Sequence, residues 1–314
     1  MGAALALGER GRGRTAPNPN VGCIIVNDGH VVGRGWTQPG GRPHAEAMAL
    51  AQAGSAARGG TLYVTLEPCA HASDRGPACA DLIVGSGIAR VVAALRDPDP
   101  RTDGTGFDRL RAAGVVVEIG VGADEAQLAM AGFLTRCRHG RPYVTLKLAL
   151  SLDGCIALSD GASKWITGPA ARAHGHLQRA RSDVILVGRG TLNADQPTLD
   201  VRLPGLEDRG PARALLTHGA APDRWLEVPS PEAISTLPGN DLLVEGGAGA
   251  ATAFLKADLV DRLMIYRAPI VIGGRTALRE LGLADLANAH HCWRPFDSRM
   301  LGNDRLDIYD RARE

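Results

Sequence analysis

The chain has 314 residues, a length that favours two domains over one. Hydrophobic residues make up 45% and charged residues 22%, as in ordinary globular proteins, whereas aromatic residues make up only 4%, so the cores must be mainly aliphatic. A net charge of +1 gives no electrostatic reason to expect a nucleic acid or a membrane surface as partner, and no apolar run reaches the roughly 20 residues of a membrane span.

The first 140 residues alternate between helical and extended patterns. They predict a helix over 3–10, a hairpin over 21–36 that turns at 27–29, and a helix over 44–54. A strand (61–66), a helix (79–87), a strand (89–95), a helix (107–114) and a strand (115–120) follow, and then one longer helix (124–138). This alternation predicts an α/β domain. The arginines near the N-terminus come after the short apolar stretch, the reverse of a signal peptide, which favours a cytoplasmic protein.

A domain boundary is expected at Gly140–Pro142, which divides the chain into domains of 1–140 and 141–314. The second domain restarts the α/β pattern with a strand (143–150), a helix (169–183), a strand (184–188) and a loop rich in Asp and Pro. The stretch 203–240 is rich in Pro and Gly and has few periodic positions, so it gives the weakest secondary-structure signal of the chain.

Three potential zinc ligands lie in the first domain. His44 stands at a helix start, Cys69 follows a strand and Cys79 opens the next helix, and such ends can converge at one edge of a sheet. Three protein ligands would leave the fourth position of a catalytic zinc to water. Glu46 completes the His-x-Glu pattern of zinc deaminases, in which the glutamate moves protons and is not a ligand.

Each of these residues also has a simpler interpretation. A His-x-Glu pair on a helix is often accidental, and single buried cysteines often act as small core residues. A structural zinc would need a fourth protein ligand, for which His71 is a candidate. Their conjunction within one α/β unit favours a catalytic zinc over these alternatives.

The motifs "TAPNPNVGCIIV", "PHAEAMAL", "TLYVTLEPCAH", "RGPAC" and "ARVVAALRDPDP" resemble the deaminase half of the bifunctional riboflavin biosynthesis proteins. In this family a pyrimidine deaminase is fused to a reductase. The second half is similar too, through "PYVTLKLALSLDG", "SKWITG", "VGRGTLNADQPTL" and "LLVEGG". The resemblance implies an N-terminal cytidine-deaminase-like three-layer αβα domain and a C-terminal dihydrofolate-reductase-like α/β domain.

The resemblance also implies the reactions and their cofactors. The deaminase would remove the 2-amino group of 2,5-diamino-6-ribosylamino-4(3H)-pyrimidinone 5′-phosphate with Zn²⁺ held by His44, Cys69 and Cys79 and with Glu46 as proton shuttle. The reductase would then convert the ribosyl chain to ribityl with NADPH. The partner is thus a small phosphorylated pyrimidine, and the family implies a homo-oligomer, a dimer or a tetramer.

The resemblance places further residues at the two sites. In the deaminase, Asn18 and His71 would contact the pyrimidine, and Arg75 would bind substrate from a loop that is one residue longer than usual in the family. Asn18 beside proline could instead be a turn-former. The implied reductase residues that bind substrate are Ser163, Arg179, Leu199, Arg202 and Glu245, and those that bind NADPH are Ala149, Trp165, Thr191, Asp195 and Gly247.

The residues alone support the second site less strongly. The glycine-rich turn "VEGGAGA" follows a strand and precedes a helix, so it could hold a phosphate or be no more than a tight turn. The two arginines suit a sugar phosphate but could equally lie on a solvated face, and Trp165 alone would fit a core position.

One departure from the family pattern favours an alternative function. Around 203–240 the reductase domain looks shortened, without the usual strand and without the small residue that contacts NADPH after it. The alternative is a deaminase whose degenerate reductase domain serves structure or oligomerisation. Two further alternatives are a deaminase of nucleosides or nucleic acid, against which the neutral charge and scarce aromatics argue, and a non-enzymatic zinc scaffold.

Overall fold

Strands and helices alternate through the first half of the chain and build a five-stranded sheet of order β2-β1-β3-β4-β5. The strands are β1 (Gly22–Asn27), β2 (His30–Trp36), β3 (Thr61–Val64), β4 (Arg90–Ala93) and β5 (Val116–Ile119). β1 is antiparallel to β2 and β3, whereas β3, β4 and β5 are parallel. The computed structural model describes residues 1–71 and 75–313. The chain divides into two compact units, Met1–Gly140 and Arg141–Glu314.

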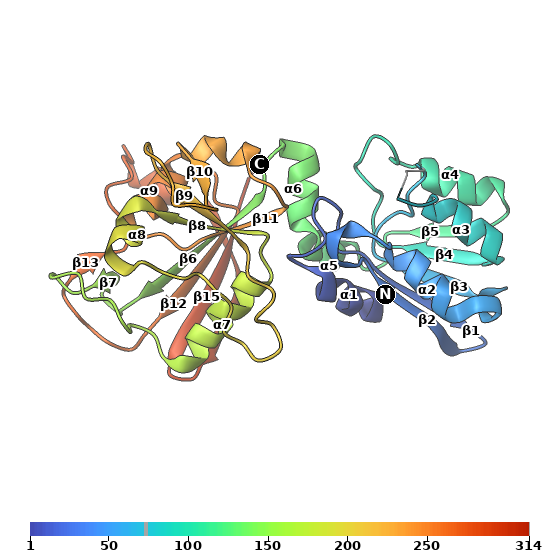
Figure 1. Cartoon of the computed structure of the whole chain (residues 1–314), viewed down its shortest axis with the longest axis horizontal. Helices are drawn as coiled ribbons and strands as arrows, with labels where there is room; N and C mark the ends of the chain where they lie inside the picture. The colour runs from blue at the N-terminus through green and yellow to red at the C-terminus, as the bar shows by residue number, and fades with distance from the viewer. Residues whose placement is uncertain (72–74, 314) are drawn as a thin grey trace. The chain divides into compact units, whose positions relative to one another are not determined.

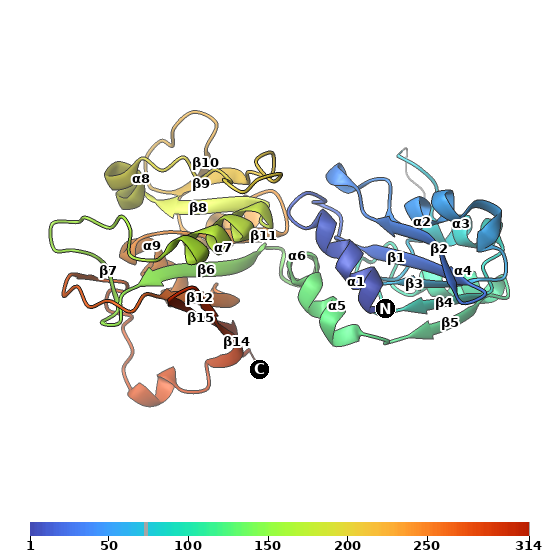
Figure 2. The same cartoon turned by 90° about the horizontal axis from the view of Figure 1, so that it is seen from below.

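Helices cover both faces of this first sheet, in three layers (Figure 1, Figure 2). α1 (Gly2–Gly8) and α5 (Ala123–Ala129) lie on one face, and α2 (Ala45–Ala53), α3 (Cys79–Ser86) and α4 (Thr105–Ala112) on the other. Short 3-10 helices follow at Glu9–Gly11, Pro39–Gly41 and Gly54–Ala57. The helix predicted over 124–138 is instead divided into α5 and α6 (Ala131–His139) at the buried Met130, whose φ of −111° interrupts the helical backbone.

Glycines in β1 and β2 let the helices approach the sheet closely. A Cβ on Gly22 would lie 1.8 Å from the carbonyl oxygen of Ala4 in α1, and one on Gly35 would lie 2.0 Å from that of Ala45 in α2. Gly35 pairs with Cys23, the neighbour of Gly22, so the two glycines point to opposite faces of the sheet. α2 is therefore packed tightly on β2, which fixes the place of its first turn.

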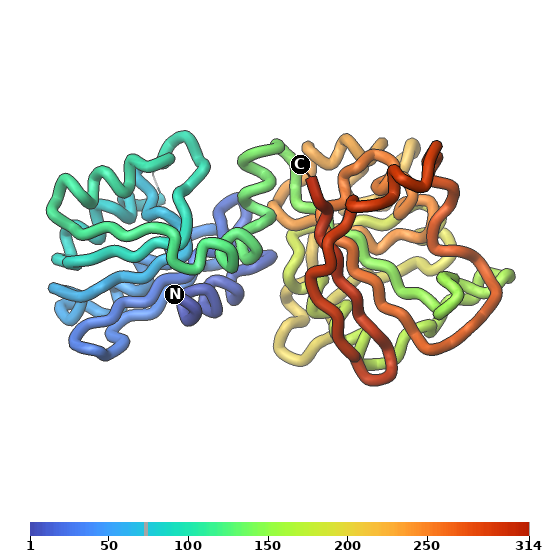
Figure 3. Tube along the Cα trace, turned by 180° about the vertical axis from the view of Figure 1, so that it is seen from behind, coloured from blue at the N-terminus to red at the C-terminus, as the bar shows by residue number. Residues whose placement is uncertain are grey.

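The second unit contains an eight-stranded sheet of order β10-β9-β8-β11-β6-β12-β15-β14. Its parallel part comprises β6 (Tyr143–Leu150), β8 (Val184–Gly188), β9 (Ala212–Leu216), β10 (Leu226–Val228), β11 (Asp241–Val244) and β12 (Arg262–Arg267). The antiparallel hairpin of β14 (Trp293–Leu301) and β15 (Asp304–Arg311) completes it and is drawn in red in Figure 3. β7 (Cys155–Ala157) and β13 (Arg275–Thr276) form a separate small sheet.

The alternation of β6 separates the two faces of this sheet. Val144, Leu146, Leu148 and Leu150 are buried in one core cluster with Phe254 of α9 (Ala248–Lys256). The residues between them point to the opposite face, where Ala171 of α7 (Pro169–Ala180) packs on Tyr266. Further helical segments are α8 (Arg189–Asp195) and the 3-10 helices Pro231–Thr236 and Leu286–Ala289.

Two expectations for this unit are wrong. The stretch 203–240 does contain strands, because β9 pairs in parallel with β8 along its whole length and β10 pairs with β9. The sheet has therefore not lost this strand. Its sequence, Ala-Arg-Ala-Leu-Leu, buries only two residues fully and has no clear alternation, so it gives a weak local signal. The loop expected after 188 begins instead with the helix α8.

Candidate functional sites

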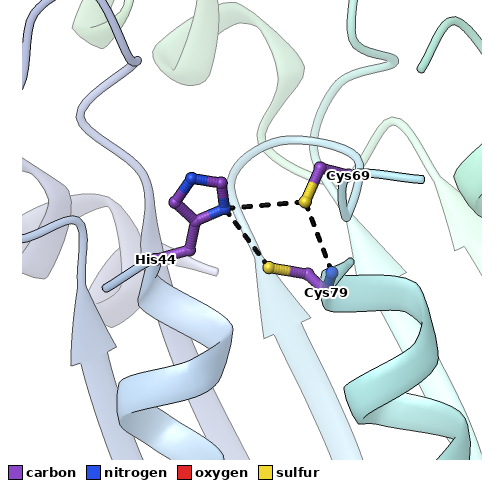
Figure 4. A group of neighbouring side chains, drawn as sticks. All are labelled: His44, Cys69 and Cys79. Carbon is purple, nitrogen blue, oxygen red and sulfur yellow. Dashed lines mark hydrogen bonds between the residues drawn. The ribbon is translucent and has the colours of Figure 1, made fainter. Parts of the chain in front are cut away.

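The three potential zinc ligands of the first unit lie together (Figure 4). His44 is the N-cap residue of α2, Cys69 lies beyond the end of β3, and Cys79 is the first residue of α3. The Nδ1 atom of His44 is 3.3 Å from the Sγ atom of Cys79 and 3.6 Å from that of Cys69. Because the ligand atoms all lie within 4.8 Å of one another, one nitrogen and two sulfurs can bind a single zinc ion and leave a fourth position open.

The protonation of the two thiols suits a metal centre. Hydrogen bonds from the Cys79 side chain, and then from His44 and the backbone N–H of Cys79, lower the pKa of Cys69 to about 4. That backbone N–H donates to the Cys69 sulfur at 3.3 Å. The pKa of Cys79 is raised, because its hydrogen bond to Cys69 favours the thiol form. A cation between the two sulfurs would favour the thiolate form of both.

Glu46 lies in the first turn of α2, two residues after His44, and only 3% of its surface is exposed. Burial raises its pKa to about 6, although His44 acts to lower it. A carboxyl group with this pKa can both accept and release a proton near neutral pH.

Of the three residues expected to bind the deaminase substrate, Asn18 and Arg75 lie beside this centre, whereas the contact of His71 is with Thr102. The Nδ2 atom of Asn18 is 2.9 Å from Nε2 of His44 and also donates to the carbonyl of Gly41, so Asn18 orients the imidazole ring. His71 contacts the hydroxyl of the buried Thr102 at 3.4 Å. Arg75 donates to the carbonyl of Gly40 and lines a cavity of about 420 Å³ together with His44 and Cys79. Part of the longer loop, residues 72–74, lies outside the described residues.

Glu67 is a structural residue of this site that the sequence analysis missed. Its buried carboxylate accepts backbone N–H groups from Asp97, Gly104, Gly106 and Phe107 at 2.9–3.2 Å. Two of these belong to the first turn of α4, whose N-cap residue is a glycine without a capping side chain. Glu67 therefore caps α4 from another segment and holds the 97–107 segment beside Cys69; the only local signal was its place in Glu-Pro-Cys.

In the second unit, one large cavity of about 1850 Å³ brings together all ten residues expected at the reductase site. These residues come from distant parts of the chain, between β6 and the start of α9, and are Ala149, Ser163, Trp165, Arg179, Thr191, Asp195, Leu199, Arg202, Glu245 and Gly247. A cavity of this size can hold a dinucleotide and a second ligand side by side.

A buried ion pair lies inside the cavity. The Nε and Nη2 atoms of Arg179 donate to the two carboxylate oxygens of Glu245 at 2.8 and 2.9 Å, and Nη1 donates to the carbonyl of Asp200. Burial acts to raise the pKa of Glu245, but Lys147 and Arg179 outweigh it, so the pKa is lowered. The bidentate edge of Arg179 is thus already engaged by a carboxylate. Arg202 is more open, with 58% of its side chain exposed and Asp200 at 3.4 Å.

Two further cavity residues were missed by the sequence analysis. Lys147 points to the same face of β6 as Ala149 and lies 3.8 Å from Glu245, which the two-residue period of the strand could have indicated. Thr217 lies directly after β9 and lines the cavity. This is the position at which the family pattern has a small residue in contact with NADPH, a residue that we did not identify in the sequence. The Thr217 hydroxyl accepts a hydrogen bond from Arg189.

The glycine-rich turn forms the start of α9. Gly247 is the N-cap residue, and its N–H donates to the hydroxyl of Thr191 at 2.9 Å. A Cβ on Gly246 would lie 2.4 Å from the side chain of Ala250, so only glycine lets the turn close on the helix. Trp165, which also lines the cavity, is 63% exposed and lies under the guanidinium of Arg172, so it is a surface residue and not a core one.

Comparisons with known proteins match both domains. Residues 1–95 match the cytidine and deoxycytidylate deaminase zinc-binding region, and residues 142–226 and 225–301 match the RibD C-terminal domain. The riboflavin biosynthesis protein RibD of Escherichia coli is 40% identical over 340 residues, covering 92% of each chain, and that of Mycobacterium tuberculosis H37Rv is 38% identical, covering 98% and 95%. The chain belongs to the RibD family.

Solved structures of the family have the same fold. The RibD of Acinetobacter baumannii is 35% identical, with a TM-score of 0.90 over 100% of this chain and 98% of that one. A diaminohydroxyphosphoribosylaminopyrimidine deaminase/5-amino-6-(5-phosphoribosylamino)uracil reductase from Thermotoga maritima is 31% identical, with a TM-score of 0.90 over 99% and 97%. The predicted pairing of a deaminase-like and a reductase-like α/β domain is confirmed.

Membership of the RibD family defines the class of enzyme. The chain is a bifunctional deaminase and reductase of riboflavin biosynthesis, and its cofactors are zinc and NADPH. This function is favoured over a deaminase with a degenerate second domain, in agreement with the presence of β9. Among the residues that the structure describes, no helix has the length and apolar character needed to span a membrane.

Proposed function

We propose that the chain catalyses two successive steps on one phosphorylated pyrimidine. The 1–140 domain would deaminate 2,5-diamino-6-ribosylamino-4(3H)-pyrimidinone 5′-phosphate, and the 141–314 domain would reduce its ribosyl group to ribityl with NADPH. The observation that carries the proposal is the combination, in one chain, of the His44–Cys69–Cys79 cluster beside a buried Glu46 with a large cavity in a RibD-type C-terminal domain.

In the deaminase, His44, Cys69 and Cys79 would hold the zinc ion. Zinc bound there acts as a Lewis acid that makes water a strong nucleophile near neutral pH. Glu46 would accept one proton from the attacking water and pass it to the ring nitrogen, where it stays. It would then take the second proton from the new hydroxyl group and pass it to the amine, which leaves as ammonia, a task that suits its pKa of about 6. Asn18 and His71 would orient the pyrimidine ring from the two sides of the cluster.

In the reductase, the cavity residues would place the sugar against the cofactor. NADPH supplies the hydride. Gly247, Thr191 and the start of α9 would hold its phosphates, with Ala149, Trp165 and Asp195 along the rest of the cofactor.

The substrate would be held by the other wall of the same cavity. Arg202, the more exposed of the two arginines, together with Ser163 and Leu199, would bind it near the phosphate. The Arg179–Glu245 pair and Lys147 would face the sugar, where they can orient its hydroxyl groups and exchange a proton. We further propose that the enzyme works in the cytoplasm and forms a homo-oligomer.

A paired assay on the purified, zinc-loaded chain tests this function. Ammonia release and NADPH oxidation are followed in one reaction with the diaminopyrimidine phosphate. We expect both, with NADPH oxidation depending on prior deamination. Ammonia release without NADPH oxidation would contradict the reductase half of the proposal. The absence of both signals would contradict the whole proposal.

A further inference from the structure

The cavity above the zinc ligands has a strongly one-sided charge. It is lined by the two arginines Arg42 and Arg75, by His44 and Cys79, and by the uncharged residues Pro43, Ala47, Gly76, Pro77 and Leu82. No carboxylate is among these described lining residues. A concave site whose described lining carries two guanidinium groups attracts an anion.

Arg42 stands two residues before His44, and its side chain lines this cavity. Its backbone is extended (φ −148°, ψ 150°), and its side chain is partly buried. A Cβ on Gly76 would lie 3.2 Å from its Nη1 atom, so the guanidinium lies against the loop that leads to Cys79. Arg42 thus bridges the segments that carry two of the three metal ligands.

The two arginines differ in what they already bind. Arg75 donates from Nη2 to the carbonyl of Gly40 at 2.7 Å, which ties its loop to the 3-10 helix Pro39–Gly41. For Arg42, no ion pair with a carboxylate and no side-chain hydrogen bond is found within the part of the chain that the structure describes. Its guanidinium therefore has its planar donor edge available for a ligand, and this edge matches the oxygens of a phosphate.

We propose that Arg42 binds the 5′-phosphate of the substrate in the deaminase site and thereby selects the phosphorylated pyrimidine over its nucleoside. The inference rests on the proposed deamination and adds a specificity residue to it. The phosphate would lie in the cavity beside Arg42, while the ring occupies the space next to His44 and Cys79.

The test compares two substrates, the diaminopyrimidine phosphate and the same compound after removal of its phosphate. Arg42→Ala removes the charge-assisted hydrogen bonds between the guanidinium and the phosphate. We therefore expect it to lower kcat/KM for the phosphorylated substrate by roughly tenfold to a hundredfold. The value for the dephosphorylated compound should stay the same, so the ratio between the two substrates collapses. Arg42→Lys should recover part of the ratio, because lysine keeps the charge but not the planar fork.

Arg34→Ala is the matched control. It removes the same charge from an exposed position on β2 that does not line the cavity, so both kcat/KM values should remain at the wild-type level. Zinc content and NADPH oxidation with the deaminated substrate should be unchanged in all variants, which shows that the metal centre and the second domain are intact.

Two results would overturn the inference: an unchanged ratio with Arg42→Ala, or an equal loss on both substrates. A failure of the proposed function looks different, because then the wild-type protein releases no ammonia from either compound. In that case, titration of the zinc-loaded wild-type and Arg42→Ala proteins with inorganic phosphate still decides the matter. The wild-type protein should show one more binding event than the variant, and identical titrations would refute the role of Arg42.

Discussion

Glu67 allows a sharp test of how the deaminase centre is held together. Replacing it with Gln keeps its size but exchanges one acceptor oxygen for an NH₂ group. The remaining oxygen can still accept from Gly106 and Phe107, whereas the NH₂ group then meets the backbone N–H groups of Asp97 and Gly104. Donors would face donors in a buried place.

The magnitude follows from these contacts. Each buried N–H group that loses its acceptor costs about 1–3 kcal/mol, so two of them predict a loss of about 2–6 kcal/mol in the free energy of unfolding. A domain is typically stable by about 5–15 kcal/mol, so Glu67→Gln should fold but be clearly weakened. Glu67→Ala would leave all four N–H groups unpaired and could lose most of the domain's stability.

Scanning calorimetry of the zinc-loaded full chain measures this effect. In a unit of this size, a loss of about 1 kcal/mol lowers Tm by roughly 3 °C. We therefore expect the Tm of the first domain to fall by roughly 6–18 °C and the Tm of the second domain to stay unchanged. Glu118→Gln is the control, because it also removes a carboxylate but breaks only an exposed ion pair with Arg90, and it should cause no measurable shift. A Glu67→Gln transition within about 2 °C of the wild type would refute the argument that these hydrogen bonds hold the segment.

Three other predictions concern the two sites and a partly buried histidine of α7. Glu46→Gln should lower ammonia release by roughly 10²–10⁴-fold and leave zinc content and NADPH oxidation intact; loss of the metal in elemental analysis would count against its role as proton shuttle. Arg179→Met should leave Glu245 buried without its main partner, destabilise the second domain by about 3–5 kcal/mol and stop NADPH oxidation but not ammonia release, as calorimetry and the paired assay can show. Burial, followed by the nearby Arg299, lowers the pKa of His174 from 6.5 to about 4. Below pH 6.5 the unfolded chain binds this proton before the folded chain does, so the free energy of unfolding should fall as the pH drops towards 4. Chemical denaturation across this pH range should show a smaller fall for His174→Asn, and an unchanged fall would contradict the role of His174.

Local patterns were sufficient for the features that depend on neighbouring residues. The hairpin of β1 and β2 follows from β-branched residues around an Asn-Asp-Gly turn, and its strands fall within the expected range. The helix starts at Ala45 and Cys79 and the glycine stops after them are encoded within a few residues. The zinc cluster could be recognised because its residue types and their places at element ends are visible in the sequence, and the family motifs carried the rest.

The features that were missed depend on segments far apart in the chain. β9 is a strand because it pairs with β8, and its own Ala-Arg-Ala-Leu-Leu pattern is too weak to show it. Likewise, Glu67 accepts hydrogen bonds from N–H groups of residues 30 to 40 positions away, and Arg179 donates a bidentate pair of hydrogen bonds to Glu245, 66 positions away. The sequence determined which chemical groups are present and which local elements carry them. Only the tertiary structure decided which buried polar groups satisfy one another and which, like Arg42, remain available to a ligand, because hydrogen bonding and burial depend on distances in space and not on spacing along the chain.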